Sequence, residues 1–283
     1  MPSATLLGQS LLSGILTGGL YALLGMGLSL SWKFQRVINL AHFGFIFLGA
    51  YLTYQLAGVW GLSPFLAMAL IVPGLFALGV ALQALFARFN VNEFASLLVT
   101  FGFVAIIESA IQWVWTADFR RLESAYGTAS VRLGPLFLPV AEAMALAVAV
   151  ALSLAIWAVL RFTFTGKALR ASVEDADIAA AFGVRHRRLF LLMSGVSAAT
   201  AGIAGTFVAL IATLAPSQIY AWIGVIFAVV ILGGLGNPLG ILAAGLLIGV
   251  SEAITMALTA PSWAPLVSFT LLILILILRP GRV

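Results

Sequence analysis

The chain has no cysteine, only two histidines and few charged residues, and each shortage excludes a class of protein. Without cysteine there is neither a disulfide nor a thiolate metal site. The histidines, His42 and His186, lie in different sequence surroundings and cannot form a zinc site by themselves. Charged residues are 8% of the chain, whereas an ordinary soluble domain has about 25%. This composition is not that of a soluble domain.

What the chain has instead is long apolar runs. It is 63% hydrophobic, with a mean hydropathy of +1.17, and 63 consecutive residues between Arg188 and Glu252 carry no charge. One helical crossing of a bilayer needs about 20 apolar residues, so this stretch corresponds to about three crossings. Turn-forming residues at 215–217 and 233–238 divide it. The chain is therefore an integral membrane protein.

The whole sequence predicts an all-α, polytopic transmembrane bundle of eight or nine helices in a single domain, 1–283. The run at 219–233 is short unless it is extended back to Pro216, and we expect the first run to be a retained span rather than a signal peptide. The apolar runs that define the expected helices are 7–30, 40–57, 65–86, 95–115, 140–160, 189–211, 219–233, 238–256 and 264–278.

Basic residues orient the bundle. With nine spans and the C-terminus inside, inside loops hold 11 basic residues and outside loops hold 3, which agrees with the positive-inside rule. The N-terminus is then outside. The inside residues are Lys33, Arg36, Arg88, Arg161, Lys167, Arg170, Arg185, Arg187, Arg188, Arg279 and Arg282. The outside residues are Arg120, Arg121 and Arg132, and their loop, 116–139, is a candidate docking surface.

Two further patterns concern helix packing. Residues 39–50 contain Asn39, His42 and two glycines, which makes this segment the candidate for a broken or re-entrant helix. Small residues recur at fourfold spacing, which lets helix backbones approach closely. These faces serve either packing within one bundle or contact with a second subunit. They are Gly14, Gly18 and Ala22; Ser194, Ala198 and Gly202; Gly236, Gly240 and Ala244; and Gly245 and Gly249.

The loop 161–188 is the most informative polar segment, with six basic and three acidic residues. Ser172 and Asp175 resemble a helix N-cap with a capping box, residues 177–182 form a short helix, and Gly183 supplies a left-handed C-cap. This pattern predicts a compact helical hairpin on the cytoplasmic side. It is either a solvated loop or a docking element for a partner.

Several segments resemble known permeases. Residues 177–183, Asp-Ile-Ala-Ala-Ala-Phe-Gly, resemble the coupling-helix motif of ABC importer permeases, with Asp177 in place of its Glu. Residues 19–27, 37–42, 166–171 and 230–240 resemble the branched-chain amino acid (LivH-type) permeases, in family order over nearly the whole chain. Two positions depart from that family: Phe43 replaces a Gly, and Val225 replaces a common Lys.

The resemblance implies the permease subunit of an ABC importer with alternating access. The expected partners are a second permease subunit, homologous or identical, two cytoplasmic ATPases, an extracytoplasmic substrate-binding protein and the lipid bilayer. The residues implied in ATPase coupling are Glu174, Asp175, Asp177, Ala180, Gly183, Val184 and Arg185. The helix-break motif comprises Gly233, Gly234, Gly236 and Asn237.

Polar groups inside a membrane are candidates for function. The pathway candidates are Asn39, His42, Glu108 and Gln112. For Glu108 the alternative is a carboxyl hydrogen-bonded within the bundle, and for His42 it is a buried histidine that caps a broken helix. Glu252 is expected near a span end, in reach of interfacial water, and Glu142 at a helix N-terminus.

Other functions find less support in the sequence. Residues 234–240 lack the third glycine of a dinucleotide site, and Gly166-Lys167 lacks the rest of a phosphate loop, so we expect no ATP site, no cofactor and no enzymatic activity in this chain. No catalytic constellation, metal site or nucleic-acid role is expected. The alternative is an ion-coupled secondary transporter or channel acting without ATPases, which would need paired mid-membrane acids.

The expected location is the bacterial cytoplasmic (inner) membrane, as a multi-pass protein. The substrate stays open among branched-chain or other amino acids, urea, amides and small aromatic acids.

Overall fold

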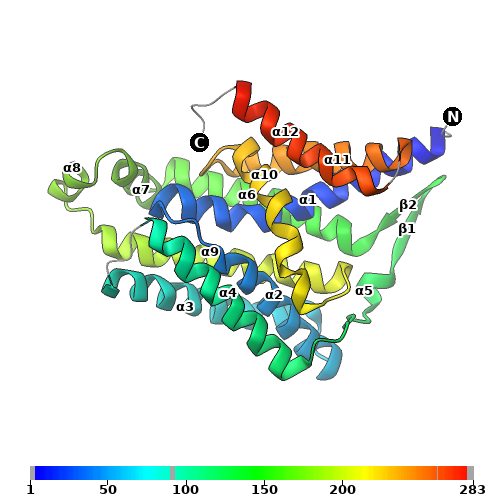
Figure 1. Ribbon diagram of the computed structural model, residues 1–283, viewed down its shortest axis with the longest axis horizontal. Coiled ribbons are helices and arrows are strands. Elements are labelled where there is room, and N and C mark those ends of the chain that lie inside the picture. Colours follow the sequence, from blue (N-terminus) through cyan, green and yellow to red (C-terminus); the bar gives the residue numbers. More distant parts are fainter. Residues whose placement is uncertain (1–3, 90–92, 260, 279–283) are drawn as a thin grey trace.

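The computed structural model describes residues 4–89, 93–259 and 261–278 and is almost entirely helical (Figure 1). The first half contains α1 (Ala4–Gln35), α2 (Ala41–Thr53), the π-helix η1 (Tyr54–Val59), α3 (Pro64–Phe89), α4 (Glu93–Trp115), α5 (Ala125–Thr128), β1 (Ser130–Leu133), β2 (Leu136–Pro139) and α6 (Val140–Phe162). The second half contains α7 (Phe164–Glu174), α8 (Ala176–Ala181), α9 (His186–Ile211), the 3-10 helix η2 (Pro216–Trp222), α10 (Ile223–Gly233), α11 (Pro238–Leu258), η3 (Pro261–Trp263) and α12 (Ala264–Leu278).

The predicted all-α polytopic bundle is confirmed. Every one of the nine predicted apolar runs contains a helix, and in the described residues seven helices are long and apolar enough to cross a membrane. The sixth of them, Pro216–Gly233, reaches 18 residues only because it begins at Pro216, which agrees with the expected extension of the short run at 219–233. The segment α2 and the segment α12 are apolar but shorter. The count of eight or nine is thus approximate.

Two helices form the centre of the bundle. In the 18-residue apolar stretches of α1 and α9, 67% and 78% of the residues are buried, whereas the other spans bury 22–39% of theirs. The helix α1 packs against α11, α9 and α6, while α9 packs against α3, α2 and α1. Because lipid replaces water around the bundle, the outer faces of the remaining helices keep large apolar side chains exposed.

Small residues bring α1 and α11 together. A Cβ atom added at Gly18 would lie 2.6 Å from the Gly245 carbonyl oxygen, and one added at Gly14 would lie 2.6 Å from the Val250 Cα. Gly79 of α3 packs against Ser194 and Ala198 of α9 in the same way, because a Cβ atom added at Gly79 would collide with both residues. These small faces therefore pack within one chain, which is the simpler of the two expectations.

The helix break after α1 differs in position from the prediction. Residues 36–39 are not helical, Arg36 has a φ of +53°, and α2 is regular from Ala41 onward. His42 Nε2 lies 3.0 Å from the Leu24 carbonyl oxygen. Leu24 precedes the end of α1 at Gln35 by eleven residues, which corresponds to about 16 Å along the helix axis. The chain thus turns back into the bundle before α2 begins, and the predicted segment 39–50 contains only the last part of the break.

The two ends of the bundle are different. The hairpin of α7 and α8 projects at one end, and the β1–β2 hairpin lies at the other end with the N-terminus (Figure 1). The strands are antiparallel, with Ser130 opposite Pro139. The described basic residues assigned to the inside gather at the α7–α8 end, while Arg279 and Arg282 lie outside the described residues. Glu142 lies in the first turn of α6, as predicted.

Candidate coupling hairpin and membrane-embedded polar site

The α7–α8 hairpin is a compact structure with apolar residues at its tip. Thr163 caps α7 by accepting a hydrogen bond from the Gly166 amide, and Asp175 caps α8 by accepting from the amides of Asp177 and Ile178. Gly183 ends α8 with a φ of +85°, so its predicted left-handed C-cap is confirmed. The caps fix a six-residue helix that would not be stable alone.

The predicted N-cap role of Ser172 is wrong. Ser172 lies inside α7, where its hydroxyl donates to the Ala168 carbonyl and lies 3.1 Å from His186 Nδ1. The acidic residue that follows it, Asp175, is itself the cap, because a carboxylate accepts two amide hydrogens where the helix starts. The short helix is Ala176–Ala181, one residue earlier than predicted at both ends.

The residues implied in coupling lie together on this hairpin. Glu174, Asp175, Asp177, Ala180, Gly183 and Arg185 are exposed, and Val184 is half-buried. Two large apolar side chains, Ile178 and Phe182, are 59% and 86% exposed. An exposed aromatic at a protruding tip is typical of a protein contact. Neither was singled out from the sequence, although both lie within the coupling motif, residues 177–183.

Removing the α8 cap tests this local architecture. Asp175→Ala leaves two amides of the first turn without their acceptor, which costs about 1 kcal/mol. We expect amide hydrogen exchange of residues 177–181 to accelerate about fivefold, with Asp175→Asn restoring slow exchange because Asn also caps. Equal exchange in the Asp175→Ala variant and the wild type would contradict the assignment of this cap.

The pathway candidates separate into two environments. Asn39 and His42 lie at the helix break, 4% and 0% exposed, where His42 bridges α2 to α1. Glu108 and Gln112 lie on α4, joined by a 3.2 Å hydrogen bond from Gln112 Nε2 to Glu108 Oε1. The structure brings Glu108 to another element, since the Tyr220 hydroxyl donates to Glu108 Oε2 at 2.9 Å.

A second carboxyl belongs to the same face. Glu252 is only 7% exposed and accepts hydrogen bonds from the hydroxyls of Tyr21, at 2.7 Å, and Ser268. The expectation that Glu252 reaches interfacial water is wrong, because α1 and α12 cover it. Sequence reasoning singled out neither Tyr21 nor Ser268, since residues 231 and 16 positions away become partners only through packing.

The two carboxyl sites border one cavity of about 540 Å³. Tyr220 and Glu252 both line it, and no lysine or arginine is among its described lining residues. Its apolar wall includes Trp222, Val225 and Phe269. Val225, one of the two positions at which the sequence departs from the permeases that it resembles, therefore contributes to the apolar wall. We name this cavity, with Tyr21, Glu108, Tyr220, Glu252 and Ser268, the polar site.

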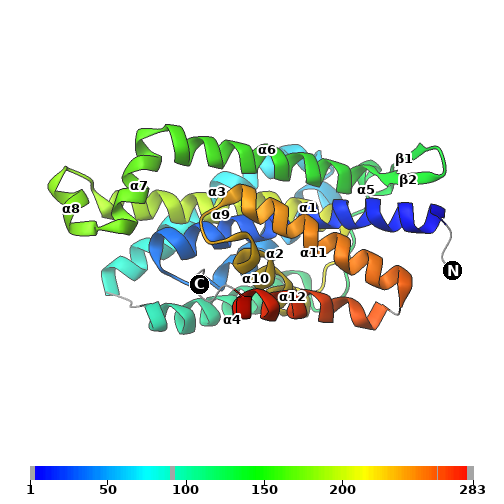
Figure 2. The same cartoon turned by 90° about the horizontal axis from the view of Figure 1, so that it is seen from above.

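The polar site lies on one face of the bundle. The helices α4, α10 and α12 share this face, and α6 covers the opposite one (Figure 2). The helix-break motif ends α10, with Gly234 and Gly236 at φ of +85° and +73° and Asn237 capping α11 through the Gly240 amide. The Gly236 amide donates to Ser29 Oγ, which ties the break to the C-terminal part of α1. Non-helical backbone thus lies against a central helix.

Comparisons with known proteins agree with this architecture. The family model for the branched-chain amino acid transport system permease component matches residues 10–276. The chain is 25% identical to the LivH permease protein of Salmonella typhimurium, over 96% of this chain and 93% of that one. It is 23% identical to BraD of Pseudomonas aeruginosa, over 96% and 94%, and 25% identical to LivM of Escherichia coli, over 92% and 67%. No solved structure matches the chain.

These matches cover the central bundle, the hairpin and the polar site alike. A transport component of this kind is not an enzyme, and its seven apolar spans make it a multi-pass membrane protein. The chain belongs to the family of branched-chain amino acid transport system permease components.

Proposed function

We propose that this chain works with a second permease subunit, two cytoplasmic ATPases and an extracytoplasmic binding protein in a bacterial inner membrane. The curated relatives include both LivH and LivM permease proteins of one named transport system, which supports pairing with a related chain. The exposed tip of the α7–α8 hairpin supports an ATPase contact. The hairpin carries ATPase movement to α1, α6 and α9, against which α7 packs.

The substrate in this proposal is an amino acid or a related small solute that carries an amino or amide nitrogen. The observation that carries it is the polar site: a carboxyl held by two hydroxyls, in a cavity without a basic residue among the described lining residues. A carboxyl in such a site favours a partner that donates hydrogen bonds or bears positive charge. The apolar wall suits a small apolar side chain.

One experiment distinguishes the ATP-driven importer from the ion-coupled secondary transporter or channel. Proteoliposomes containing the chain, its permease partner and both ATPases take up labelled leucine in the presence of the binding protein and internal ATP. Uptake should persist when protonophore and sodium ionophore collapse all ion gradients. Uptake that needs a gradient and ignores ATP would overturn the importer assignment.

Glu252→Gln tests the polar site directly. The amide keeps the shape of the carboxyl but replaces one acceptor oxygen with a donor, so we expect leucine uptake to fall about tenfold or more. Tyr21→Phe removes one hydrogen bond and should reduce uptake less. Glu142→Gln, the same substitution on α6 at the opposite face, serves as the control and should retain uptake.

Assembly must be measured alongside uptake. Copurification of the ATPases and thermal stability should be unchanged in the Glu252→Gln variant if the carboxyl serves the pathway. Wild-type uptake in that variant would remove Glu252 from the pathway.

A further inference from the structure

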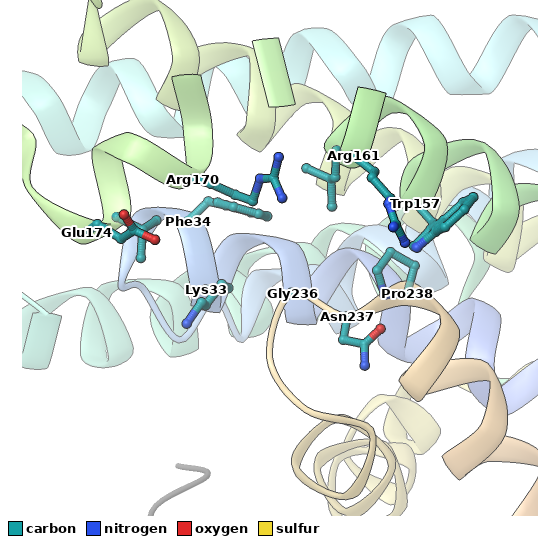
Figure 3. Close-up of a pocket in the computed structure, with 11 residues that line it drawn as sticks. Lys33, Phe34, Trp157, Arg161, Arg170, Glu174, Gly236, Asn237 and Pro238 are labelled. Carbon is teal, nitrogen blue, oxygen red and sulfur yellow. The ribbon is translucent and has the colours of Figure 1, made fainter. Parts of the chain in front are cut away.

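A second cavity, of about 580 Å³, lies at the α7–α8 end of the bundle, and its lining residues, drawn in Figure 3, include none of those that form the polar site. Four segments meet there: the end of α1, the end of α6, α7, and the turn before α11. We name it the basic cavity. Its described lining residues are Lys33, Phe34, Trp157, Leu160, Arg161, Arg170, Val173, Glu174, Gly236, Asn237 and Pro238.

The described lining of the basic cavity carries more positive than negative charge. Lys33, Arg161 and Arg170 come from three different elements, and Glu174 is the single acid beside them. Across residues 4–89, 93–259 and 261–278, none of the three cations lies within 4.0 Å of a carboxylate, since the ion pair found there joins Arg120 to Asp118. Like charges that line one hollow favour an anion within it.

One of the cations is held in place by aromatic rings. The Arg161 guanidinium lies 5.3 Å from the centre of the Trp157 ring and 5.8 Å from that of Phe162. Cation–π contacts restrict the guanidinium without consuming its hydrogen-bond donors. A guanidinium presents a planar set of donors that matches the oxygens of a phosphate.

The depth of the cavity matches the headgroup layer of a bilayer. Lys33 lies in the last turn of α1 and Arg161 in the last turn of α6, while Trp157 is one turn further into the span. Tryptophan is enriched at this boundary between membrane and water. The cavity therefore opens where lipid phosphates are concentrated.

An apolar track leads from the cavity toward the membrane interior. Val150, Leu154, Trp157 and Arg161 are spaced by four, three and four residues, so they share one face of α6. Val150 and Leu154 are 36% and 49% exposed. A molecule with its phosphate at Arg161 could extend acyl chains along this face, which a free phosphate would leave unused.

From these observations we propose that the basic cavity binds the phosphate of an anionic phospholipid, with the acyl chains along the exposed face of α6. The site would link α1, α6, α7 and the turn before α11 through one lipid. This inference does not depend on the proposed transport function, because it needs only that the chain resides in a membrane.

The test compares lipid binding in matched variants. The purified full chain, in detergent, is titrated with phosphatidylglycerol and phosphatidylcholine, and the bound lipids are counted by native mass spectrometry. We expect the wild type to prefer phosphatidylglycerol by about tenfold or more, since each basic residue near an anionic headgroup contributes severalfold. The variant Lys33→Gln/Arg161→Gln/Arg170→Gln should lose this preference.

The control removes the same charge from the same end of the bundle. Arg88, Lys167 and Arg188 are exposed and lie outside the basic cavity, so Arg88→Gln/Lys167→Gln/Arg188→Gln should keep the tenfold preference. Should the cavity variant fail to fold, Arg161→Lys/Arg170→Lys keeps the charge and tests the guanidinium geometry. Its preference for phosphatidylglycerol should lie between that of the wild type and the equal binding of both lipids that is expected of the cavity variant.

Three outcomes would overturn the proposal. The first is an unchanged phosphatidylglycerol preference in the cavity variant. The second is displacement of the lipid by inorganic phosphate at millimolar concentration, which would identify a soluble-anion site instead. The third is loss of ATPase copurification in the cavity variant with unchanged lipid binding, which would identify the cavity as a protein contact.

Discussion

Gly18→Val is expected to prevent α1 and α11, the two most closely packed helices, from packing against each other. The added side chain would enter the backbone of α11, because even a Cβ at this position lies 2.6 Å from both the Gly245 oxygen and the Leu246 Cα. Backbone atoms cannot rotate away as a flexible side chain does, so α1 and α11 must separate. We expect a loss of about 3 kcal/mol or more in the free energy of unfolding, at or above the usual cost of overpacking.

The measurement is thermal unfolding of the purified chain in detergent. Gly74→Val is the matched control, since Gly74 lies within α3 and a Cβ there meets no atom within 4 Å. Its unfolding temperature should remain close to that of the wild type. Equal unfolding temperatures for the Gly18 and Gly74 variants would show that α1 and α11 do not pack as described.

Phe182→Ala is expected to abolish most ATPase binding while the chain stays folded. The side chain is 86% exposed beside the C-terminus of α8, so its removal leaves no internal cavity. A central aromatic contact is commonly worth 2 kcal/mol or more in binding, which corresponds to about 30-fold weaker association. The measurement is the affinity of the purified ATPase for the chain in nanodiscs.

The same substitution at the base of the hairpin provides the control. Phe164 is 85% exposed at the start of α7, so Phe164→Ala removes an equal side chain at an equal exposure. It should bind the ATPase like the wild type. A second variant, Ala180→Asp, places a charge on the exposed side of α8 and should weaken binding as well. If Phe182→Ala and Ala180→Asp both bind normally, α8 is not the contact.

The sequence by itself determined the membrane class, the apolar runs and the α7–α8 hairpin. These are local properties: a span needs about 20 apolar residues wherever it packs, and Gly183 ends a helix through its own backbone freedom. The ordered motifs led to the family for the same reason, since each lies within a few consecutive residues.

Only the tertiary structure decided which polar groups act together. Glu252 was expected to meet water, yet α1 and α12 bring Tyr21 and Ser268 to it. Glu108 accepts a hydrogen bond from Tyr220, 112 residues away in the sequence, and Lys33 lines one cavity together with Arg161 and Arg170. An apolar span has no polar face that fixes its rotation, so sequence periodicity cannot say which side of a helix meets which neighbour. In this chain that choice depends on where small residues let two backbones touch.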